Sequence, residues 1–205
     1  MTSSTESTWL NTRFRGYLPV VVDIETGGFN DKTDAILQIG ACILAADTNN
    51  KLSIASSHFY EVAPFEGANL EKSALQFTGI APYAEDRNDV AEATALKDFF
   101  KVVRDAVKAA GCKKAILVGH NAFFDLGFVN AGIERCNIKR VPFHPFSTLD
   151  TVSLGALFYQ QTVLAKCCAQ ANIEFSNEAA HNAGYDAEKT AELFCKMINE
   201  FPMHG

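Results

Sequence analysis

Apolar and β-branched residues gather in short runs along the first half of the chain, a pattern typical of buried strands. The first such run, Leu18–Ile24, is followed by the turn-forming sequence Thr26-Gly27-Gly28. Further strands are expected at Ala35–Leu44, at Ser57–Val62, where polarity alternates, at Ala115–Val118 and, more weakly, at Thr148–Asp150.

Apolar residues repeat at helical spacing in most of the remaining segments. The clearest helix is expected from about Ala91 to Ala110, with Gly111 as its stop signal. Further helices are expected at 124–135, 151–159, 162–171 and 185–200. Strands come first and helices interleave later, which predicts an α/β fold, a mixed sheet covered by helices.

The chain has 205 residues, enough for one domain with a sizeable core. We expect a polar N-terminal lead-in at 1–17 and a single domain at 18–205. With 48% hydrophobic and 20% charged residues, the composition is that of a globular protein, and no apolar run is long enough to cross a membrane. Met1 to Trp9 contain no apolar stretch typical of a signal peptide. The six cysteines form no C-x-x-C pair, which favours a reducing, cytoplasmic location over a disulfide framework or zinc ribbon.

Positive charge is concentrated in one part of an acidic chain. The net charge is −6, yet residues 97–140 contain nine Lys and Arg against four Asp and Glu, a local charge of +5. Such a patch favours a polyanionic partner, although a solvated helix face explains the same spacing equally well. Its members are the helical stripe Lys97, Lys101, Arg104 and Lys108, then Lys113, Lys114, Lys139 and Arg140, with Arg13 and Arg15 as further candidates.

Two acidic residues end the first apolar strand. Asp23 and Glu25 flank Ile24, and side chains alternate along a strand, so both carboxylates point to one face, roughly 7 Å apart. Two carboxylates there repel each other and lose hydration, and a divalent cation would offset both effects. The alternatives are that the strand has ended and both acids are solvated, or that one of them caps a helix.

Two further acids open predicted helices. Asp125 lies in Gly119-His120-Asn121-Ala122-Phe123-Phe124-Asp125, and Asp186 follows His181 by five residues. Taken singly, each acid is explained by the helix macrodipole, and His181 by a surface location. No P-loop, dinucleotide-binding or nucleophile-elbow motif competes with this set.

Taken together, three motifs resemble those of the DEDDh 3′→5′ exonucleases, a superfamily that includes polymerase proofreading subunits and oligoribonuclease. The first is Asp23-Ile24-Glu25-Thr26-Gly27, the second Gly119-His120-Asn121 with Phe124-Asp125, and the third His181 with Asp186. They occur in the same order and spacing, and the resemblance spans about residues 18 to 200.

Stretches outside these motifs resemble one branch of the superfamily, which trims the 3′ ends of structured RNA. They are Pro64–Leu70, Phe77–Ile80, Pro142–Phe146, Gln161–Leu164 and Ala180-His181. One position departs from that pattern: Ser73 stands where the branch has an acidic residue that contacts the terminal base, so 3′-base discrimination is left open.

The resemblance implies a ribonuclease H-like fold, with a five-stranded mixed sheet flanked by helices on both faces. It implies that Asp23, Glu25, Asp125 and Asp186 hold two Mg²⁺, for which Mn²⁺ can substitute. It also implies that His181 acts as general base on the attacking water, and an imidazole can accept a proton near neutral pH.

The resemblance further implies substrate contacts. Most Phe residues are core by default, but Phe29, Phe77, Phe124 and Phe146 become candidates for stacking on the 3′-terminal bases, and Thr26 for contacting the terminal nucleotide. The substrate would be RNA with a single-stranded 3′ end, including transfer RNA. Single-stranded DNA is also expected, because stacking needs no 2′-hydroxyl.

The resemblance also implies a homodimer in which one subunit's basic patch holds RNA that enters the active site of the other. Three alternatives stay open: a DNA proofreading exonuclease, an oligoribonuclease, and a non-catalytic nucleic-acid-binding protein on the same fold. The basic stripe favours a long polyanion over the short substrates of an oligoribonuclease.

Overall fold

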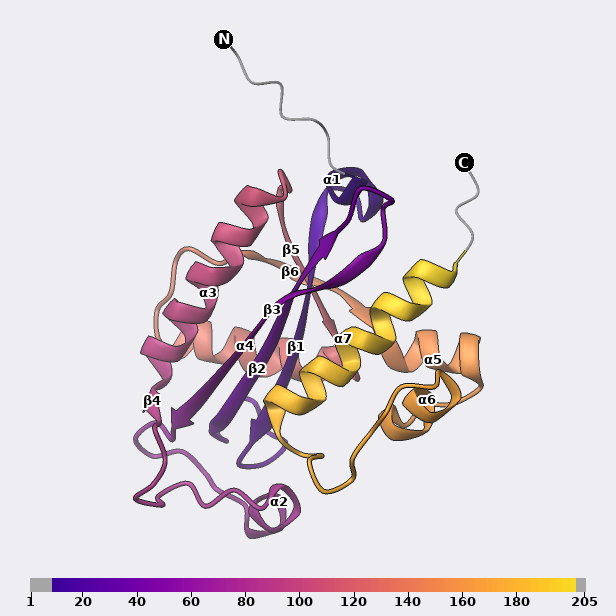
Figure 1. Ribbon diagram of the computed structural model, residues 1–205. Coiled ribbons are helices and arrows are strands. Elements are labelled where there is room, and N and C mark those ends of the chain that lie inside the picture. Colours follow the sequence, from indigo (N-terminus) through magenta and orange to yellow (C-terminus); the bar gives the residue numbers. More distant parts are fainter. Residues whose placement is uncertain (1–8, 202–205) are drawn as a thin grey trace.

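The computed structural model describes residues 9–201 (Figure 1). A six-stranded mixed sheet has the strand order β4-β3-β2-β1-β5-β6. The strands are β1 (Tyr17–Thr26), β2 (Ile36–Ala46), β3 (Leu52–Ala63), β4 (Val90–Ala91), β5 (Lys114–Gly119) and β6 (Phe143–Asp150). β1, β2 and β3 form an antiparallel meander, and β5 and β6 continue from β1 in parallel.

The mixed sheet and its helical layers confirm the predicted fold class, but the expected count of five strands is wrong by one. The additional strand is β4, whose two residues pair with Val62 and Ala63 at the end of β3. Both β4 residues are exposed, so no apolar run marked the strand in the sequence.

Within residues 9–201, seven helices pack around the sheet or connect its strands. They are α1 (Trp9–Arg13), α2 (Lys72–Thr78), α3 (Glu92–Ala109), α4 (Ala122–Arg135), α5 (Thr151–Tyr159), α6 (Leu164–Gln170) and α7 (Ala183–Glu200). The sequence predicted α3 to α7 to within about two residues. Figure 1 shows α7 crossing one face of the sheet, while α3 and α4 lie on the other.

Successive side chains of β3 point to opposite faces of the sheet. The ring of Phe59 lies against the start of α7, where a Cβ on Gly184 would be 3.1 Å from it. The next residue, Tyr60, contacts the ring of Phe99 on α3. Phe99 is fully buried together with Phe100 and Phe143, so the core under α3 is largely aromatic.

The predicted lead-in at 1–17 lies partly outside the described residues, as does most of the Met1–Trp9 segment. Its described part includes α1, where Leu10 is buried. The boundaries of the lead-in and of the single domain stay predictions. In the described part of the chain, every helix is too short or too polar to cross a bilayer.

Candidate active site

The five residues predicted to perform catalysis line one cavity. Its volume is about 470 Å³, and it opens at the carboxyl end of β1, between the amino-terminal ends of α4 and α7. Strand alternation places Asp23 and Glu25 on one face, as predicted. The cavity lining includes Asp23, Glu25, Asp125, His181 and Asp186.

Asp125 is fixed to β1 by a hydrogen bond across 101 residues of sequence. Its Oδ1 accepts the backbone N–H of Ile24 at 2.9 Å. Gly119, at the end of β5, leaves room for it, because a Cβ on Gly119 would lie 3.1 Å from Asp125 Oδ2. The third acid is therefore a buried member of the site, and the macrodipole alone does not explain its position.

Asp186 and His181 are joined across the start of α7. The N–H of His181 donates to Asp186 Oδ2 at 2.8 Å, while His181 has a left-handed backbone with φ of 65°. Asn182 caps the helix by accepting the N–H of Tyr185. Asp186 Oδ1 is buried and has no hydrogen-bond partner among the described residues.

The four carboxyl groups are costly to ionise together. Burial raises the pKa of Asp23 well above its usual range, and Asp125, Glu25 and Asp186 add to this by repulsion. Burial, followed by the charge of Asp186, raises the pKa of Glu25 to about 7. Burial also raises the pKa of Asp125 to about 8, and that of Asp186 above its ordinary value. A cation among these groups would offset both the lost hydration and the repulsion.

The donor atoms suit a divalent cation. One carboxylate oxygen each from Glu25 and Asp186 and a ring nitrogen of His181 lie within 4.8 Å of one another. The unpartnered Asp186 Oδ1 adds a further free acceptor. Carboxylate oxygens are the ligands that Mg²⁺ and Mn²⁺ prefer, so the residues present fit the expected metals.

A second cavity of about 350 Å³ adjoins the acids and has aromatic walls. Phe29, Phe77 and Phe124 line it, and Thr26 and Ser73 contribute to its wall. Phe29 is 82% exposed and Phe77 is 68% exposed, which contradicts the default expectation of core positions. The Phe77 ring also lies 4.2 Å from the His181 ring, centre to centre.

Phe146, the fourth predicted stacking residue, does not line either cavity. It is 77% exposed on β6, and its ring is nearly perpendicular to that of His144, with the ring centres 4.6 Å apart. Thr26 donates its hydroxyl to Gly28 O at 2.6 Å, so it shapes the turn that leads to Phe29.

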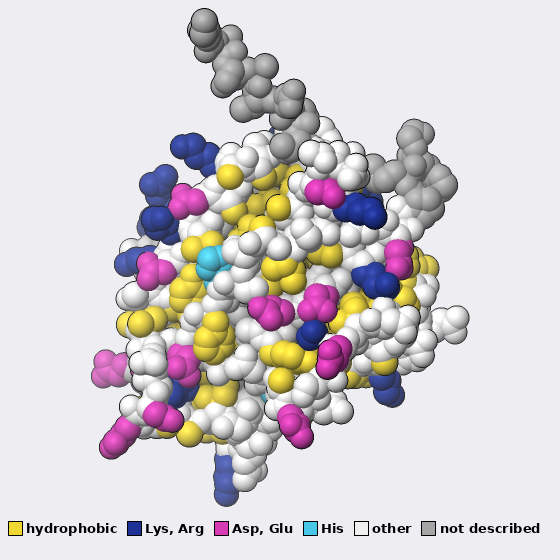
Figure 2. Space-filling model, in the orientation of Figure 1, with side chains coloured by type: hydrophobic (Ala, Val, Ile, Leu, Met, Phe, Trp, Pro, Cys, Tyr) yellow, Lys and Arg dark blue, Asp and Glu magenta, His cyan; other side chains and the backbone are white. Residues whose placement is uncertain are grey.

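Most of the predicted basic residues surround a depression of about 510 Å³ at the other end of the sheet. Its lining includes Arg104, Lys108, Lys113, Lys114, Lys139 and Arg140. Figure 2 shows Lys and Arg side chains gathered along the edge formed by α3. Lys114 pairs with Tyr17 at the start of β1, six residues before Asp23, which puts the depression roughly 20 Å from the acids at ~3.3 Å per residue.

Lys97 does not line this depression, and three other basic candidates outside it have local partners. Lys101 forms an exposed ion pair with Asp105 at 2.9 Å. The guanidinium of Arg13 lies over the rings of Trp9 and Phe14, and that of Arg15 lies over Tyr17.

The sequence suggests no more than a helix cap for Asp150 and no role for His120, and the structure gives both a positioning contact. Asp150 Oδ1 accepts the N–H of Val152 at 2.7 Å, and its Oδ2 accepts the N–H of Ala122 at 3.0 Å. One carboxylate thus joins the starts of α5 and α4. His120 bonds the Thr151 hydroxyl and the Thr162 carbonyl, and burial lowers its pKa.

Known proteins resemble this chain along most of its length. The exonuclease family model RNase_T matches residues 20–194. Ribonuclease T of Vibrio campbellii is 54% identical, and that of Vibrio vulnificus strain YJ016 is 55% identical. Both alignments cover all of this chain, together with 96% of the V. campbellii protein and 95% of the V. vulnificus protein.

Solved structures share the fold at low identity. The nuclease domain of 3′hExo, a DEDDh family member bound to rAMP, has a TM-score of 0.68 at 19% identity, covering 89% of this chain and 92% of that one. E. coli exonuclease I with a dT13 oligonucleotide has a TM-score of 0.68 at 18% identity, and the match covers 90% of this chain and 41% of the exonuclease I chain. The family model and the full-length relatives show that the chain belongs to the ribonuclease T family of 3′→5′ exoribonucleases.

Proposed function

We propose that this chain trims single-stranded 3′ tails from structured RNAs, including transfer RNA, and releases nucleoside 5′-monophosphates. The observation that carries this proposal is the adjacency of two cavities, one lined by four carboxylates and His181 and the other by exposed aromatic rings. A phosphodiester held by the first cavity would place its terminal base in the second.

Two Mg²⁺, or Mn²⁺ in their place, would be held by Asp23, Glu25, Asp125 and Asp186. When bound, such cations lower the pKa of a water molecule and stabilise the charge that develops on the phosphate. The convergence of Glu25, Asp186 and His181 atoms and the unpartnered Asp186 oxygen support this assignment.

His181 would accept the proton of the attacking water at a ring nitrogen. That nitrogen lies within 4.8 Å of the Glu25 and Asp186 oxygens, so a water held between these carboxylates is within reach. Because the His181 side chain is exposed, the ring can turn toward solvent and release the proton afterwards. A general base of this kind is worth about 10²–10⁴ in rate.

The aromatic cavity would hold the 3′-terminal bases by stacking on Phe29, Phe77 and Phe124, with Thr26 beside the terminal nucleotide. Phe146 would contact RNA elsewhere on the surface. Stacking accepts any base and needs no 2′-hydroxyl, so we propose that single-stranded DNA is also cleaved. A ring wedged against the last base pair would stop digestion close to a duplex.

The basic depression would bind RNA for the other subunit of a homodimer. It lies at the opposite end of β1 from the acids, which supports action across subunits. All six cysteines are free thiols, which supports a cytoplasmic location.

A 5′-labelled RNA hairpin with a short 3′ tail tests the proposal. We expect a Mg²⁺-dependent ladder that shortens from the 3′ end and pauses near the duplex, and no ladder with EDTA or with Asp23→Asn. Cleavage of DNA alone would indicate a proofreading type of substrate, and cleavage of dinucleotides alone an oligoribonuclease. Binding of the intact RNA without cleavage would overturn the catalytic role.

A further inference from the structure

The two acids of β1 face two residues of β2 that contact the start of α7. In the antiparallel pairing of these strands, Asp23 lies opposite Gly40, and Glu25 lies opposite Gln38. Directly opposed residues share one face of a sheet, so all four positions point toward α7. Asp23 and Glu25 on β1 therefore lie beside the two residues of β2 that contact the start of α7.

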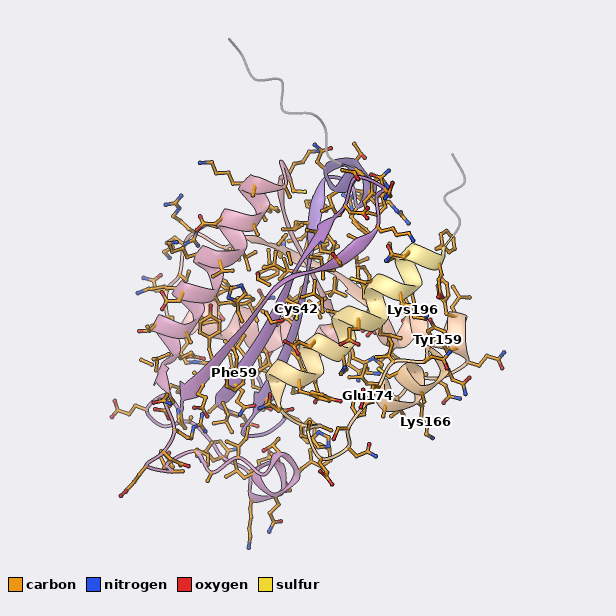
Figure 3. All side chains as sticks on the ribbon, in the orientation of Figure 1. Cys42, Phe59, Tyr159, Lys166, Glu174 and Lys196 are labelled. Carbon is orange, nitrogen blue, oxygen red and sulfur yellow. The ribbon has the colours of Figure 1, made fainter. Side chains whose placement is uncertain are left out.

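Gly40 allows the backbone of α7 to lie directly on β2. A Cβ at this position would be 1.8 Å from the Ala183 carbonyl oxygen and 2.7 Å from the Gly184 nitrogen. On the next strand, Phe59 lies opposite Gly40 and packs against Gly184, as its place beside the start of α7 shows (Figure 3). The contacts at Gly40 and Gly184 thus fix the distance between the first turn of α7 and the sheet.

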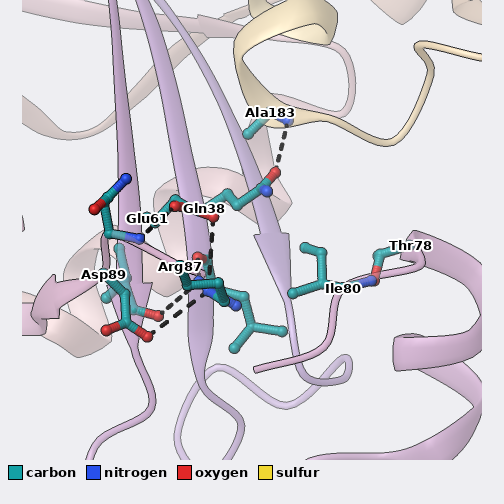
Figure 4. A network of polar contacts seen from close by, with 10 residues as sticks. Gln38, Glu61, Thr78, Ile80, Arg87, Asp89 and Ala183 are labelled. Atoms are coloured by element: carbon teal, nitrogen blue, oxygen red, sulfur yellow. Dashed lines mark hydrogen bonds and ion pairs between the residues drawn. The ribbon is translucent and has the colours of Figure 1, made fainter. Parts of the chain in front are cut away.

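Gln38 fixes the same turn by a hydrogen bond. Its Oε1 accepts the N–H of Ala183 at 3.2 Å, across 145 residues of sequence (Figure 4). Ala183 is the first residue of α7, and the first N–H groups of a helix have no partner inside it. The Gln38 side chain is buried, so a loss of this acceptor would leave the N–H of Ala183 buried and unpaired.

The strand that carries Gln38 is itself anchored. Arg87, whose side chain is 7% exposed, donates to the carbonyl oxygens of Leu37 and Val62 and contacts the carboxylates of Glu61 and Asp89. Glu61 lies opposite Gln38 on β3. Figure 4 shows this network reaching from β3 across β2 to Ala183.

We propose that Gln38 is a positioning residue for catalysis, which rests on the function proposed above. By holding the N–H of Ala183, it sets the distance between Glu25 on β1 and the His181–Asp186 pair that flanks the start of α7. Ala183 lies two residues after His181 and three before Asp186, so a shift of this turn moves both. The Glu25, Asp186 and His181 atoms would no longer converge on one point.

Two substitutions separate this role from general stability. Gln38→Met removes the acceptor at similar volume. Gln38→Glu keeps an acceptor oxygen, and burial between Glu25 and Glu61 favours its uncharged, protonated form. We expect Gln38→Met to lower kcat by roughly 10- to 100-fold, the cost of a misplaced catalytic group, while KM changes by less than about threefold. Gln38→Glu should recover most of the loss. Gln170→Met, at the exposed end of α6, is the matched control and should behave as the parent chain.

Hydrogen exchange supplies a readout besides activity. The amides of residues 183–186 should exchange faster in Gln38→Met than in Gln38→Glu, while those of β1 and β5 stay protected. Equal kcat in Gln38→Met and the parent chain would overturn the proposal, and so would an equal loss in Gln38→Met and Gln38→Glu. Asp23→Asn and His181→Ala are measured in parallel: full activity in these two would refute the catalytic assignment itself, and not the role of Gln38 alone.

Discussion

The N–H of Ile24 donates to Asp125 Oδ1 at 2.9 Å, and Ile24 lies between the two acids of β1. Because this hydrogen bond fixes the start of α4 to the carboxyl end of β1, Asp125 contributes to the stability of the fold as well as to the negative charge of the site. Its two roles are separable, since an amide oxygen can accept the same bond without carrying a charge.

We therefore expect Asp125→Asn and Asp125→Ala to differ in stability while both lose activity. Asp125→Ala leaves the buried N–H of Ile24 without a partner, which costs about 1–3 kcal/mol relative to Asp125→Asn. Urea unfolding of the two metal-free variants measures the difference. Equal free energies of unfolding would show that the Ile24 bond contributes nothing to the fold.

The raised pKa values of the acids predict an unusual pH dependence for the metal-free protein. Burial raises the pKa of Glu25 from 4.5 to about 7 and that of Asp125 from 3.8 to about 8. The folded state thus binds more protons than the unfolded chain between these limits. The stability that the two groups contribute is complete below pH ~4 and is lost as the pH rises to ~8.

Thermal unfolding in EDTA tests this dependence. We expect the difference in Tm between the Asp23→Asn variant and the parent chain to grow from pH 5 to pH 8, with the variant more stable at pH 8. Added Mg²⁺ should stabilise the parent chain most at pH 8, where the carboxyl groups are ready to bind it. A difference that is independent of pH would contradict burial and mutual repulsion as the cause of the raised pKa values.

Asp150 is expected to support activity through the start of α4. Because its two oxygens accept from Val152 and Ala122, Asp150→Ala should destabilise the fold by about 1–2 kcal/mol and lower kcat. Asp47 is a matched control, since it also accepts two backbone N–H groups, from Asn49 and Lys51, in the turn between β2 and β3. Asp47→Ala should lose stability and keep its kcat, and a loss of kcat in both variants would indicate a general effect of stability.

The sequence located the candidate catalytic residues better than the residues that support them. Alternation along one apolar run placed Asp23 and Glu25 on one face, whereas the resemblance to the exonucleases singled out Asp186. Gln38 could not be found in this way, because its partner Ala183 is 145 residues away and nothing in the local sequence marks the contact. α2 was missed because it buries no residue and so shows no apolar stripe.

The expectation that Phe residues are buried fails for several rings near the site. Phe99 and Phe100 are buried, whereas Phe29, Phe77 and Phe123 are exposed, although all are equally apolar. A single sequence does not distinguish a ring that fills the core from one that faces a ligand. The resemblance to the exonucleases indicated the difference for Phe29 and Phe77, and the structure shows their exposure.

Action of the basic patch across subunits can be tested by mixing two defective proteins. The double variant Lys108→Glu/Lys139→Glu should bind long RNA more weakly, with a salt dependence reduced by about one unit of slope per lost contact. It should still cleave a dinucleotide. Mixed with Asp23→Asn, it should regain activity on long RNA, because a mixed dimer pairs an intact patch with an intact site. Failure of the mixture to exceed the double variant alone would argue that the patch serves its own subunit or none.

Two equally exposed rings provide a matched pair for the stacking proposal. Phe29 is 82% exposed and lines the aromatic cavity, whereas Phe123 is 84% exposed and lines neither cavity at the site. Because neither ring is buried, both alanine variants should unfold at nearly the Tm of the parent chain. Loss of one stacked base costs about 1–3 kcal/mol, so Phe29→Ala should raise KM by roughly 5- to 150-fold on RNA and on single-stranded DNA alike. Phe123→Ala should leave KM unchanged on both. A rise confined to RNA would mean that Phe29 contacts the ribose and not the base, and equal effects of the two substitutions would place the terminal base outside this cavity.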